Sequence, residues 1–260
     1  MPSQPVILPD ADAVGSAVAE LVLDRLARTP TGPFILGCPG GRTCMPTYRA
    51  LAAHAEKGVD LSRVVIAMMD DYVVPGDDGE YRRIDPELSY SCLGFARRDI
   101  LAPITEAALR AGTTPPTEIW MPDPADPARY DADIEGAGGF DLFLLASGDS
   151  DGHIAFNPPG SDRHSGTRIT PLAEATREDN MATFPELTRR DMVPAHGVTV
   201  GIATIAERSR EVVMILTGAN KRRAFSRIVA ADGYEADWPA TIVAECTPRT
   251  VFADRAAAVS

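Results

Sequence analysis

Residues 140–157 read FDLFLLASGDSDGHIAFN, an apolar run followed directly by a polar segment that contains glycine. The run at residues 140–146 predicts a short strand buried on both faces of a sheet. Such a strand delivers Asp151 and His153, two residues apart, onto the loop at its end. Histidine titrates near neutral pH, and a neighbouring carboxylate can orient it and stabilise its charged form. A lone histidine is more often structural, but the strand-end position and the nearby carboxylates favour acid–base chemistry here.

The residue types of the same segment also occur in two other kinds of site. Asp149, Asp151 and His153 are residue types that also bind metal ions, but nothing comparable elsewhere in the sequence completes a ligand set. A Ser/His/Asp triad is disfavoured because the sequence has no GxSxG turn. We therefore expect acid–base catalysis with no metal ion and no other cofactor.

Apolar runs on both sides of this stretch predict the rest of the sheet. The further expected strands are residues 33–37, 63–69, 119–121, 198–202, 211–217, 241–244 and 250–252. Expected helices follow Asp10 and end before Thr29, extend from the turn at residue 43 to about residue 55, and cover residues 89–100, 126–135 and 220–231. Alternating buried strands and helices predict an α/β fold: a doubly wound, mostly parallel sheet sandwiched by helices, with ligands at the strands' carboxyl ends.

The turn after the strand at residues 33–37 contains Gly40, Gly41, Arg42 and Thr43. Glycines let a ligand approach the backbone, a helix N-terminus offers free N–H groups, and the threonine hydroxyl adds a donor. The turn has neither the lysine of a Walker loop nor the GxGxxG spacing of a dinucleotide site. It predicts an anion seat, with an ordinary tight turn as an equally weighted alternative.

The strand at residues 63–69 ends in two adjacent carboxylates, Asp70 and Asp71. At the carboxyl edge of a sheet, partial burial can raise the pKa of such a group and make it a usable base. Adjacent strand residues point to opposite faces, so we expect only one of the two to face a substrate. Solvation of both, or capping of the next turn, is the alternative.

Two long polar stretches, residues 74–87 and 157–193, interrupt the pattern of strands and helices. Long loops are uncommon unless they are functional or mobile, so at least one is a candidate lid or specificity segment. A surface insertion with short helices is the equally weighted alternative. We expect one domain over residues 1–260, with residues 157–193 as the lid or specificity segment.

The composition restricts the partners of the chain. Its 25 basic and 37 acidic residues give a net charge of −12, which argues against nucleic-acid binding but leaves room for a small anionic substrate. The four cysteines have neither zinc spacing nor a disulfide pattern, and no signal peptide or membrane-length apolar run occurs. We expect a cytoplasmic protein that does not bind membranes.

Six motifs, taken together, resemble the glucosamine-6-phosphate deaminase/isomerase family, whose superfamily includes 6-phosphogluconolactonases. They are LGCPGGRT at 36–43, MDDY at 69–72, LSYS at 88–91, DGHIAFN at 151–157, TRI at 167–169 and LTGANK at 216–221. The resemblance implies that Asp70 is the base that moves a proton between sugar carbons C2 and C1. It also implies that His153, supported by Asp151, assists ring opening.

For substrate binding, the resemblance implies that Lys221 contacts a phosphate. Arg168 and the loop from Gly40 to Thr43 would complete the binding set. The implied partner is a small anionic sugar, and the implied assembly is a homo-oligomer.

The sequence departs from the family pattern at four positions. Pro158 stands where family deaminases have the glutamate of the ring-opening relay, and proline cannot transfer a proton. Ser147 and Asp149 replace glycines, and Ala182 stands where a phosphate-binding arginine is expected. Arg42 is an additional guanidinium that could compensate. The departures favour isomerisation without deamination, or a different anionic sugar, as variants of the activity.

Two further functions are compatible with these motifs. A phosphosugar lactonase would use His153 to activate water, although the residues after His153 are more similar to the deaminases. A non-catalytic sugar-phosphate sensor would account for the missing glutamate, but the first 30 residues are too short for the usual added DNA-binding segment. The isomerase/deaminase remains the leading hypothesis.

Overall fold

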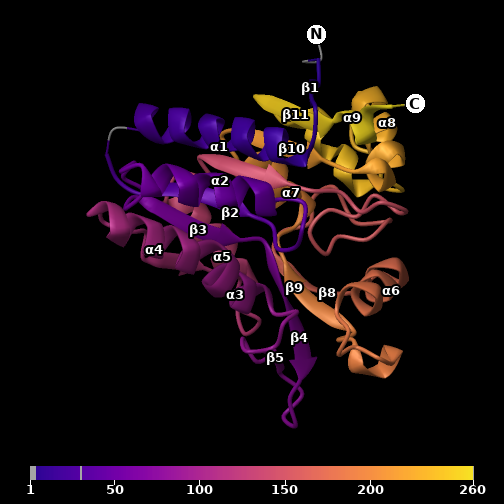
Figure 1. The fold of residues 1–260 in the computed structure, drawn as a ribbon. Coiled ribbons are helices and arrows are strands. Elements are labelled where there is room, and N and C mark those ends of the chain that lie inside the picture. Colours follow the sequence, from indigo (N-terminus) through magenta and orange to yellow (C-terminus); the bar gives the residue numbers. More distant parts are fainter. Residues whose placement is uncertain (1–3, 30, 260) are drawn as a thin grey trace.

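A seven-stranded sheet forms the centre of the molecule (Figure 1). In the computed structural model, which describes residues 4–29 and 31–259, all neighbouring strands of this sheet run parallel. In spatial order the strands are β1 (Val6–Leu8), β11 (Arg249–Asp254), β10 (Val212–Leu216), β7 (Leu142–Leu145), β2 (Phe34–Cys38), β3 (Val64–Met68) and β6 (Glu118–Trp120). The chain winds outward from β2 to β6 on one side and from β7 to β11 on the other, so the predicted doubly wound fold is confirmed.

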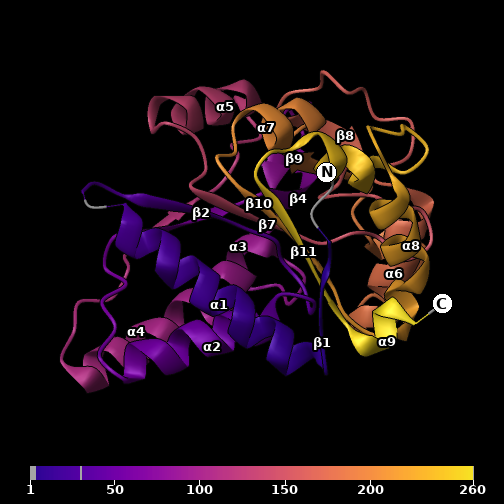
Figure 2. The same cartoon turned by 90° about the horizontal axis from the view of Figure 1, so that it is seen from above.

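Helices cover both faces of this sheet (Figure 2). One face carries α1 (Ala11–Arg28), α2 (Met45–Glu56) and α4 (Ala102–Ala111), and the other carries α5 (Pro127–Gly136), α7 (Ile202–Glu207) and α8 (Arg222–Ala230). Side chains of β2 alternate between two cores, with Leu36 in the first and Ile35 in the second. Because both faces are covered, every residue of the four central strands is buried, which explains their unbroken apolar sequences.

A second, four-stranded sheet is antiparallel and projects from the carboxyl edge of the first (Figure 1). Its order is β5 (Tyr81–Arg83), β4 (Asp70–Pro75), β9 (His196–Thr199) and β8 (Arg168–Pro171). Only Met69 separates β3 from β4, so the chain passes from one sheet to the other at the two carboxylates. The expected strand at residues 198–202 was partly wrong: it belongs to this small sheet, ends at Thr199, and is followed by α7.

The expected helix at residues 89–100 begins and ends later than predicted. It comprises α3 (Cys92–Phe95), a π-helical turn (Ala96–Leu101) and α4, which ends at Ala111. Ser91 caps its start, since the Ser91 hydroxyl accepts the N–H of Gly94 at 3.1 Å. Pro103 has no N–H to donate, and the wider π turn directly before α4 accommodates it.

The expected strand at residues 241–244 was wrong. These residues lie in a 3-10 helix, Pro239–Glu245, whose first residue is a proline that suits a helical start. Ile242 and Val243 are buried in the second core, so the β-branched run reflects packing and not a strand. The chain enters β11 only after this helix.

Both long polar stretches contain regular structure. Residues 74–87 include the turn between β4 and β5, and residues 157–193 contain β8, α6 (Glu174–Thr183) and a 3-10 turn (Arg190–Met192). Two short elements remain. A 3-10 turn (Ala219–Lys221) directly precedes α8, and α9 (Arg255–Ala258) directly follows β11. No helix within the described residues is long and apolar enough to cross a membrane.

Candidate active site

All predicted site residues except Arg168, which lies on β8 of the second sheet, follow four neighbouring strands of the main sheet. The loop at residues 40–43 follows β2, Asp70 follows β3, residues 149–153 follow β7, and Lys221 follows β10. Parallel strands end at a common edge, so these four loops meet there. The winding direction reverses between β2 and β7, which is where open α/β sheets form their ligand crevice.

Asp70 is buried, with 5% of its surface exposed. Among the described residues its side chain has one hydrogen-bond partner, the thiol of Cys92, which donates to Oδ1 at 3.3 Å. Burial raises the pKa of Asp70 to about 7, the charge of Asp71 adds to the rise, and the Cys92 thiol and the charge of His153 oppose it. A carboxylate with a pKa near neutrality can accept and return a proton at physiological pH.

Asp71 is fully buried but well supplied with donors. Its Oδ1 accepts the N–H groups of Tyr72 and Cys92, both at 2.9 Å, and its Oδ2 accepts the N–H of Leu93 at 3.2 Å. Arg83 approaches Oδ2 at 3.4 Å. Burial raises the pKa of Asp71, while these amides and Arg83 favour its charged form. Asp71 therefore fixes the start of α3, and Asp70 is the carboxylate of the pair that is free for chemistry.

Asp151 and His153 form a directly bonded pair on the loop after β7. Asp151 Oδ1 lies 2.8 Å from His153 Nδ1 and also accepts the His153 backbone N–H at 3.1 Å. Burial acts to raise the pKa of Asp151, but the hydrogen bonds and charge of His153 prevail and lower it. An ionised Asp151 on Nδ1 leaves Nε2 of His153 as the nitrogen available to a substrate.

The backbone of this loop is shaped for the pair. Gly148 donates its N–H to the carbonyl of His153 at 2.8 Å, and a side chain at Gly148 would collide with the His153 ring, whose Nδ1 would lie 2.3 Å from the added Cβ. Ala155 has a φ of 50°, a left-handed conformation that is unusual for a residue other than glycine. The loop therefore holds the imidazole against its own backbone, and the local strain lies within the DGHIAFN motif.

Lys221 lies near the same edge and is already engaged. Its ammonium forms an ion pair with Asp149 and donates to the carbonyl of Ser147 at 2.5 Å. The charge of Lys221 also acts on Cys44, the residue before α2, and lowers the pKa of that buried thiol against a larger rise caused by burial. Lys221 is thus electrostatically coupled to the end of the loop that carries Gly40, Gly41, Arg42 and Thr43.

The two predicted binding arginines, Arg42 and Arg168, differ in exposure and in the segment that each contacts. Arg42 is exposed, and its guanidinium donates to the carbonyl of Thr183 at 3.4 Å. Arg168 is half-buried and donates to Oδ1 of Asn157 at 2.8 Å, and burial lowers its pKa. Arg168 therefore contacts the end of the DGHIAFN segment, whereas Arg42 reaches α6. The side chain of Ala182 lies outside the described residues.

Two residues near the site were missed by sequence reasoning. Cys92 was not among the predicted site residues, yet burial raises the pKa of its thiol well above the usual value and keeps it a donor to Asp70. Asp179 of α6 has its pKa raised by partial burial and by Asp149 and Asp151, against the opposing charges of His153 and Lys221. The position of Cys92 directly after the LSYS motif was a usable signal. Nothing in the sequence indicated Asp179.

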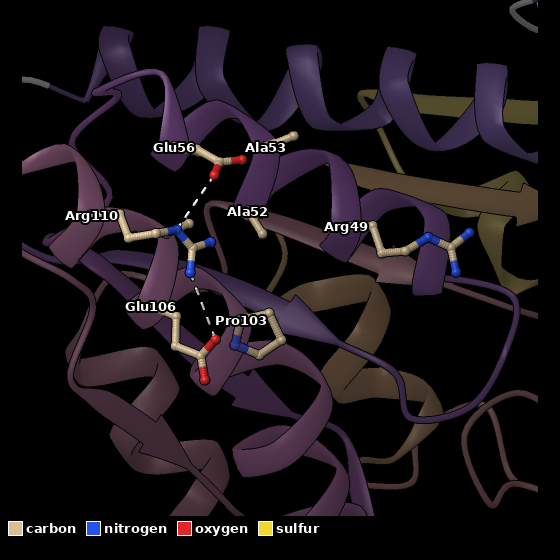
Figure 3. Close-up of a pocket in the computed structure, with 8 residues that line it drawn as sticks. Arg49, Ala52, Ala53, Glu56, Pro103, Glu106 and Arg110 are labelled. Atoms are coloured by element: carbon tan, nitrogen blue, oxygen red, sulfur yellow. Dashed lines mark ion pairs between the residues drawn. The ribbon is translucent and has the colours of Figure 1, made fainter.

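Two hollows in the described surface lie outside these loops. The first, shown in Figure 3, is formed by α2 and α4, where Arg110 pairs with Glu56 at 3.4 Å and Glu106 at 3.9 Å. The second is lined by residues that include Ile84, Arg177 and Val193. Neither contains Asp70, Asp151 or His153, so we assign the chemistry to the strand ends. Within the described part of the chain, no cluster of three or more His, Cys, Asp or Glu side chains is arranged to hold a metal ion.

The sheet edge thus combines a buried carboxylate whose pKa is raised to about 7, a carboxylate–imidazole pair and a lysine, an arrangement typical of α/β enzymes that use acid–base chemistry. The match to a family model makes the assignment specific. The chain belongs to the family described as glucosamine-6-phosphate isomerases/6-phosphogluconolactonase, whose model matches residues 9–252. The resemblance inferred from the six motifs is therefore confirmed.

Three similar proteins illustrate this relationship. A glucosamine-6-phosphate deaminase from Streptomyces avermitilis is 39% identical over 97% of this chain and 90% of its own. Among solved structures, a monomeric glucosamine-6-phosphate deaminase has a TM-score of 0.82 at 24% identity, covering 98% of this chain and 99% of its own. A 6-phosphogluconolactonase from Leishmania guyanensis has a TM-score of 0.69 at 15% identity, with 98% of each chain covered.

Proposed function

We propose that this protein is a sugar-phosphate isomerase/deaminase that converts a 2-amino-2-deoxyhexose 6-phosphate to a ketose phosphate. The observation that carries the proposal is the placement of Asp70, a buried carboxylate whose pKa lies near 7 at the crevice of the sheet. The curated relative at 39% identity is named as a glucosamine-6-phosphate deaminase, which supports the same substrate class.

Ring opening is the role that we propose for the pair on the β7 loop. His153 takes the proton from the anomeric hydroxyl and delivers a proton to the ring oxygen, while the bond between C1 and the ring oxygen breaks and C1 becomes an aldehyde. Asp151 holds Nδ1 and stabilises the charged imidazole between the two transfers. Pro158 offers no acid to this step, so the pair performs it without the glutamate of the family pattern.

Proton transfer between carbons is the role that we propose for Asp70. The carboxylate removes the proton from C2, the C–H electron pair forms a double bond between C1 and C2, and the carbonyl electron pair of C1 moves to its oxygen, which takes a proton from solvent to give an enolamine. The protonated Asp70 then returns the proton to C1, which leaves an imine at C2. Water adds to that imine and ammonia departs. One carboxylate on one face of the intermediate serves both transfers, with no other carbon acid–base group required.

Binding of the phosphate is the role that we propose for Lys221, the loop from Gly40 to Thr43, and Arg168. Met45 begins α2 directly after the loop, and Cys44 before it makes no side-chain capping bond. The Met45 N–H donates to the carbonyl of Arg42 at 3.2 Å and Pro46 has no N–H, so the helix amide that we assign to the anion is that of Thr47. The coupling between Lys221 and Cys44 supports a shared anion position.

The deciding experiment follows carbon-bound hydrogen exchange. Purified protein is incubated in deuterated water with glucosamine 6-phosphate or glucose 6-phosphate, and deuterium, ketose and ammonia are measured together. Ketose with ammonia identifies a deaminase, and ketose without ammonia identifies an isomerase. Hydrolysis of 6-phosphogluconolactone with no exchange from any sugar phosphate would overturn the proposal, because lactone hydrolysis gives Asp70 no carbon proton to move.

We further propose that residues 157–193 act as a lid over the site within a single domain of residues 1–260. Three contacts support this: Arg42 reaches Thr183, Ser89 hydrogen-bonds Glu186, and the Tyr90 and Phe184 rings lie 5.9 Å apart. Hydrogen exchange of α6 should slow when a sugar phosphate binds, and unchanged exchange would contradict a lid.

We also propose that the protein is cytoplasmic, from the sequence features given above, and that it forms a homo-oligomer, which the family resemblance implies. The similar solved deaminase is described as monomeric, so the number of subunits must be measured on this protein itself. Sedimentation at several concentrations distinguishes the two, and a 27.7 kDa species throughout would overturn the homo-oligomer.

A further inference from the structure

The ammonium of Lys221 is held by an acidic side chain of its own protein. Asp149 pairs with Lys221 through Oδ1, and the side-chain amide of Asn220 donates to Asp149 Oδ2. A second donor of the ammonium is used by the carbonyl of Ser147 at 2.5 Å. The Lys221 side chain is only 12% exposed. An incoming anion therefore meets a cation whose charge is already balanced.

We infer that Asp149 is a specificity-determining residue, which competes with the anionic group of the substrate for Lys221. This inference rests on the proposed function, because it takes Lys221 as a phosphate contact. A phosphate can use Lys221 only after the carboxylate moves away, or else it must accept repulsion from a neighbouring negative charge. Asp149 therefore reduces the advantage that a phosphorylated sugar has over the same sugar without phosphate.

The surroundings of Asp149 allow such competition. Its side chain is 35% exposed, so the carboxylate has solvent to move into. The loop does not depend on this ion pair for its shape, because Gly148 donates to the carbonyl of His153 at 2.8 Å and Arg223 donates to the carbonyl of Ser150 at 3.0 Å. The contact thus acts on the charge of Lys221 more than on the fold of the loop.

A second acidic group adds to the same field. The raised pKa of Asp179, which follows from partial burial with added repulsion from Asp149 and Asp151, indicates that α6 brings another carboxyl group toward this edge. The cations that oppose it are His153 and Lys221. Removing Asp149 therefore removes the negative charge in direct contact with Lys221 and leaves the more distant groups in place.

Titration calorimetry with inorganic phosphate tests this inference directly. Asp149→Asn keeps the size of the side chain and removes its charge, and we expect it to tighten phosphate binding by about tenfold, as for loss of a partly desolvated competing ion pair. Asp77→Asn is the matched control: it removes the same charge from an exposed position in the turn between β4 and β5, and we expect an unchanged Kd.

The double variant with Lys221→Met separates competition from a general charge effect. In that background Asp149→Asn should give no gain in phosphate affinity, since there is no ammonium to release. Equal or weaker phosphate binding by a folded Asp149→Asn protein overturns the inference, as does an equal gain in the Lys221→Met background. Asp149→Ser is measured in parallel, and thermal melting shows which variants are folded.

Kinetics then measures the consequence for substrate choice. The ratio of kcat/KM for glucosamine 6-phosphate to that for glucosamine should rise about tenfold in Asp149→Asn, mainly through a lower KM for the phosphorylated sugar. The two proposals fail differently. Absence of any turnover would refute the proposed function yet leave the phosphate-binding result intact, whereas unaltered phosphate binding would refute the role of Asp149 in an active enzyme.

Discussion

Asp70 and Asp71 are adjacent at the junction of the two sheets, and both are buried, yet their surroundings differ in kind. Asp71 accepts three backbone N–H groups and faces Arg83, whereas the one hydrogen-bond donor to the Asp70 side chain among the described residues is the thiol of Cys92. The amides and Arg83 offset part of the cost of burying the first carboxylate, whose pKa burial still raises, and that carboxylate anchors α3. The second is left short of partners, which makes its charge costly and its proton mobile. Residue type and burial alone therefore do not define a base; the number of donors decides.

The largest effect is expected from Asp70→Asn. Catalytic turnover should fall about a thousandfold, the usual cost of losing a positioned general base. The free energy of unfolding, in contrast, should increase. Because the pKa of Asp70 rises on folding from 3.8 to about 7, its contribution to stability is fully present below pH 3.8 and is lost as the pH rises through 7. At pH 8 the variant should therefore be more stable than wild type by up to about 4 kcal/mol.

Urea unfolding at pH 5 and pH 8 checks this prediction alongside the assay. The gain should be larger at pH 8, where wild-type Asp70 is ionised. An Asp70→Asn protein that keeps normal turnover would remove Asp70 from the mechanism. A variant that is less stable at both pH values would show that the carboxylate has a structural role like that of Asp71.

Asp71→Asn should have the opposite signature. Asparagine has one accepting oxygen, so its NH₂ group would face donors that the carboxylate now satisfies. We expect a loss of about 2 kcal/mol in the free energy of unfolding, typical of an unpaired buried polar group. Chemical denaturation measures the loss, and turnover per folded molecule should fall far less than in Asp70→Asn. A full loss of activity with unchanged stability would show that Asp71, like Asp70, is needed for the reaction and not for the fold.

The pH dependence of the wild-type enzyme tests the state of Asp70 without a mutation. A base must be ionised to take a proton, so kcat/KM should rise with pH up to about 7 and fall about tenfold per pH unit below it. Steady-state kinetics from pH 5 to pH 9 with a single sugar phosphate provides the profile. An acidic limb centred near pH 4 would indicate that the acting carboxylate is a well-solvated one.

The smallest expected effect comes from the thiol that contacts Asp70. The Cys92 hydrogen bond lowers the pKa of Asp70, so Cys92→Ala should move the acidic limb upward by about half a pH unit. Cys92→Ser is the matched control, because its hydroxyl can still donate and should keep the limb at or below the wild-type position. Superimposable profiles for all three proteins would show that this contact does not tune the base.

Much of the fold was predictable because the central strands have a distinctive amino-acid sequence. The strands at β2, β3, β7 and β10 are buried on both faces, which leaves unbroken apolar runs that end in Gly, Asp, Ser or Thr. The run at residues 241–244 has a similar composition and forms a 3-10 helix, because burial selects β-branched residues whether or not the backbone is extended. One strand of the second sheet was expected, at residues 198–202, but the sheet itself was missed because β5 and β8 are short and partly polar and β4 begins with two carboxylates.

The candidate site was predictable residue by residue but not contact by contact. Strand ends identified Asp70, Asp151 and His153 as candidates. Alternation along the strand also stated that Asp70 and Asp71 point apart, yet it could not state which of them receives the donors. Those donors are the amides that begin α3, some 20 residues later, and tertiary folding alone brings them there. The ion pair between Asp149 and Lys221 spans a still longer separation.

The arrangement of β10 between β7 and β11 has a consequence for protein synthesis. A nascent chain that has emerged as far as β7 already contains both carboxylates at the sheet junction, but it lacks β10, the turn after β10 that carries Lys221, and β11, on which β10 packs. Under the proposed function, the full set of site residues exists only after β10 and the turn at Ala219–Lys221 have been synthesised. Until then the edge of β7 that pairs with β10 has no partner strand, and an unpaired strand edge is prone to association with other chains.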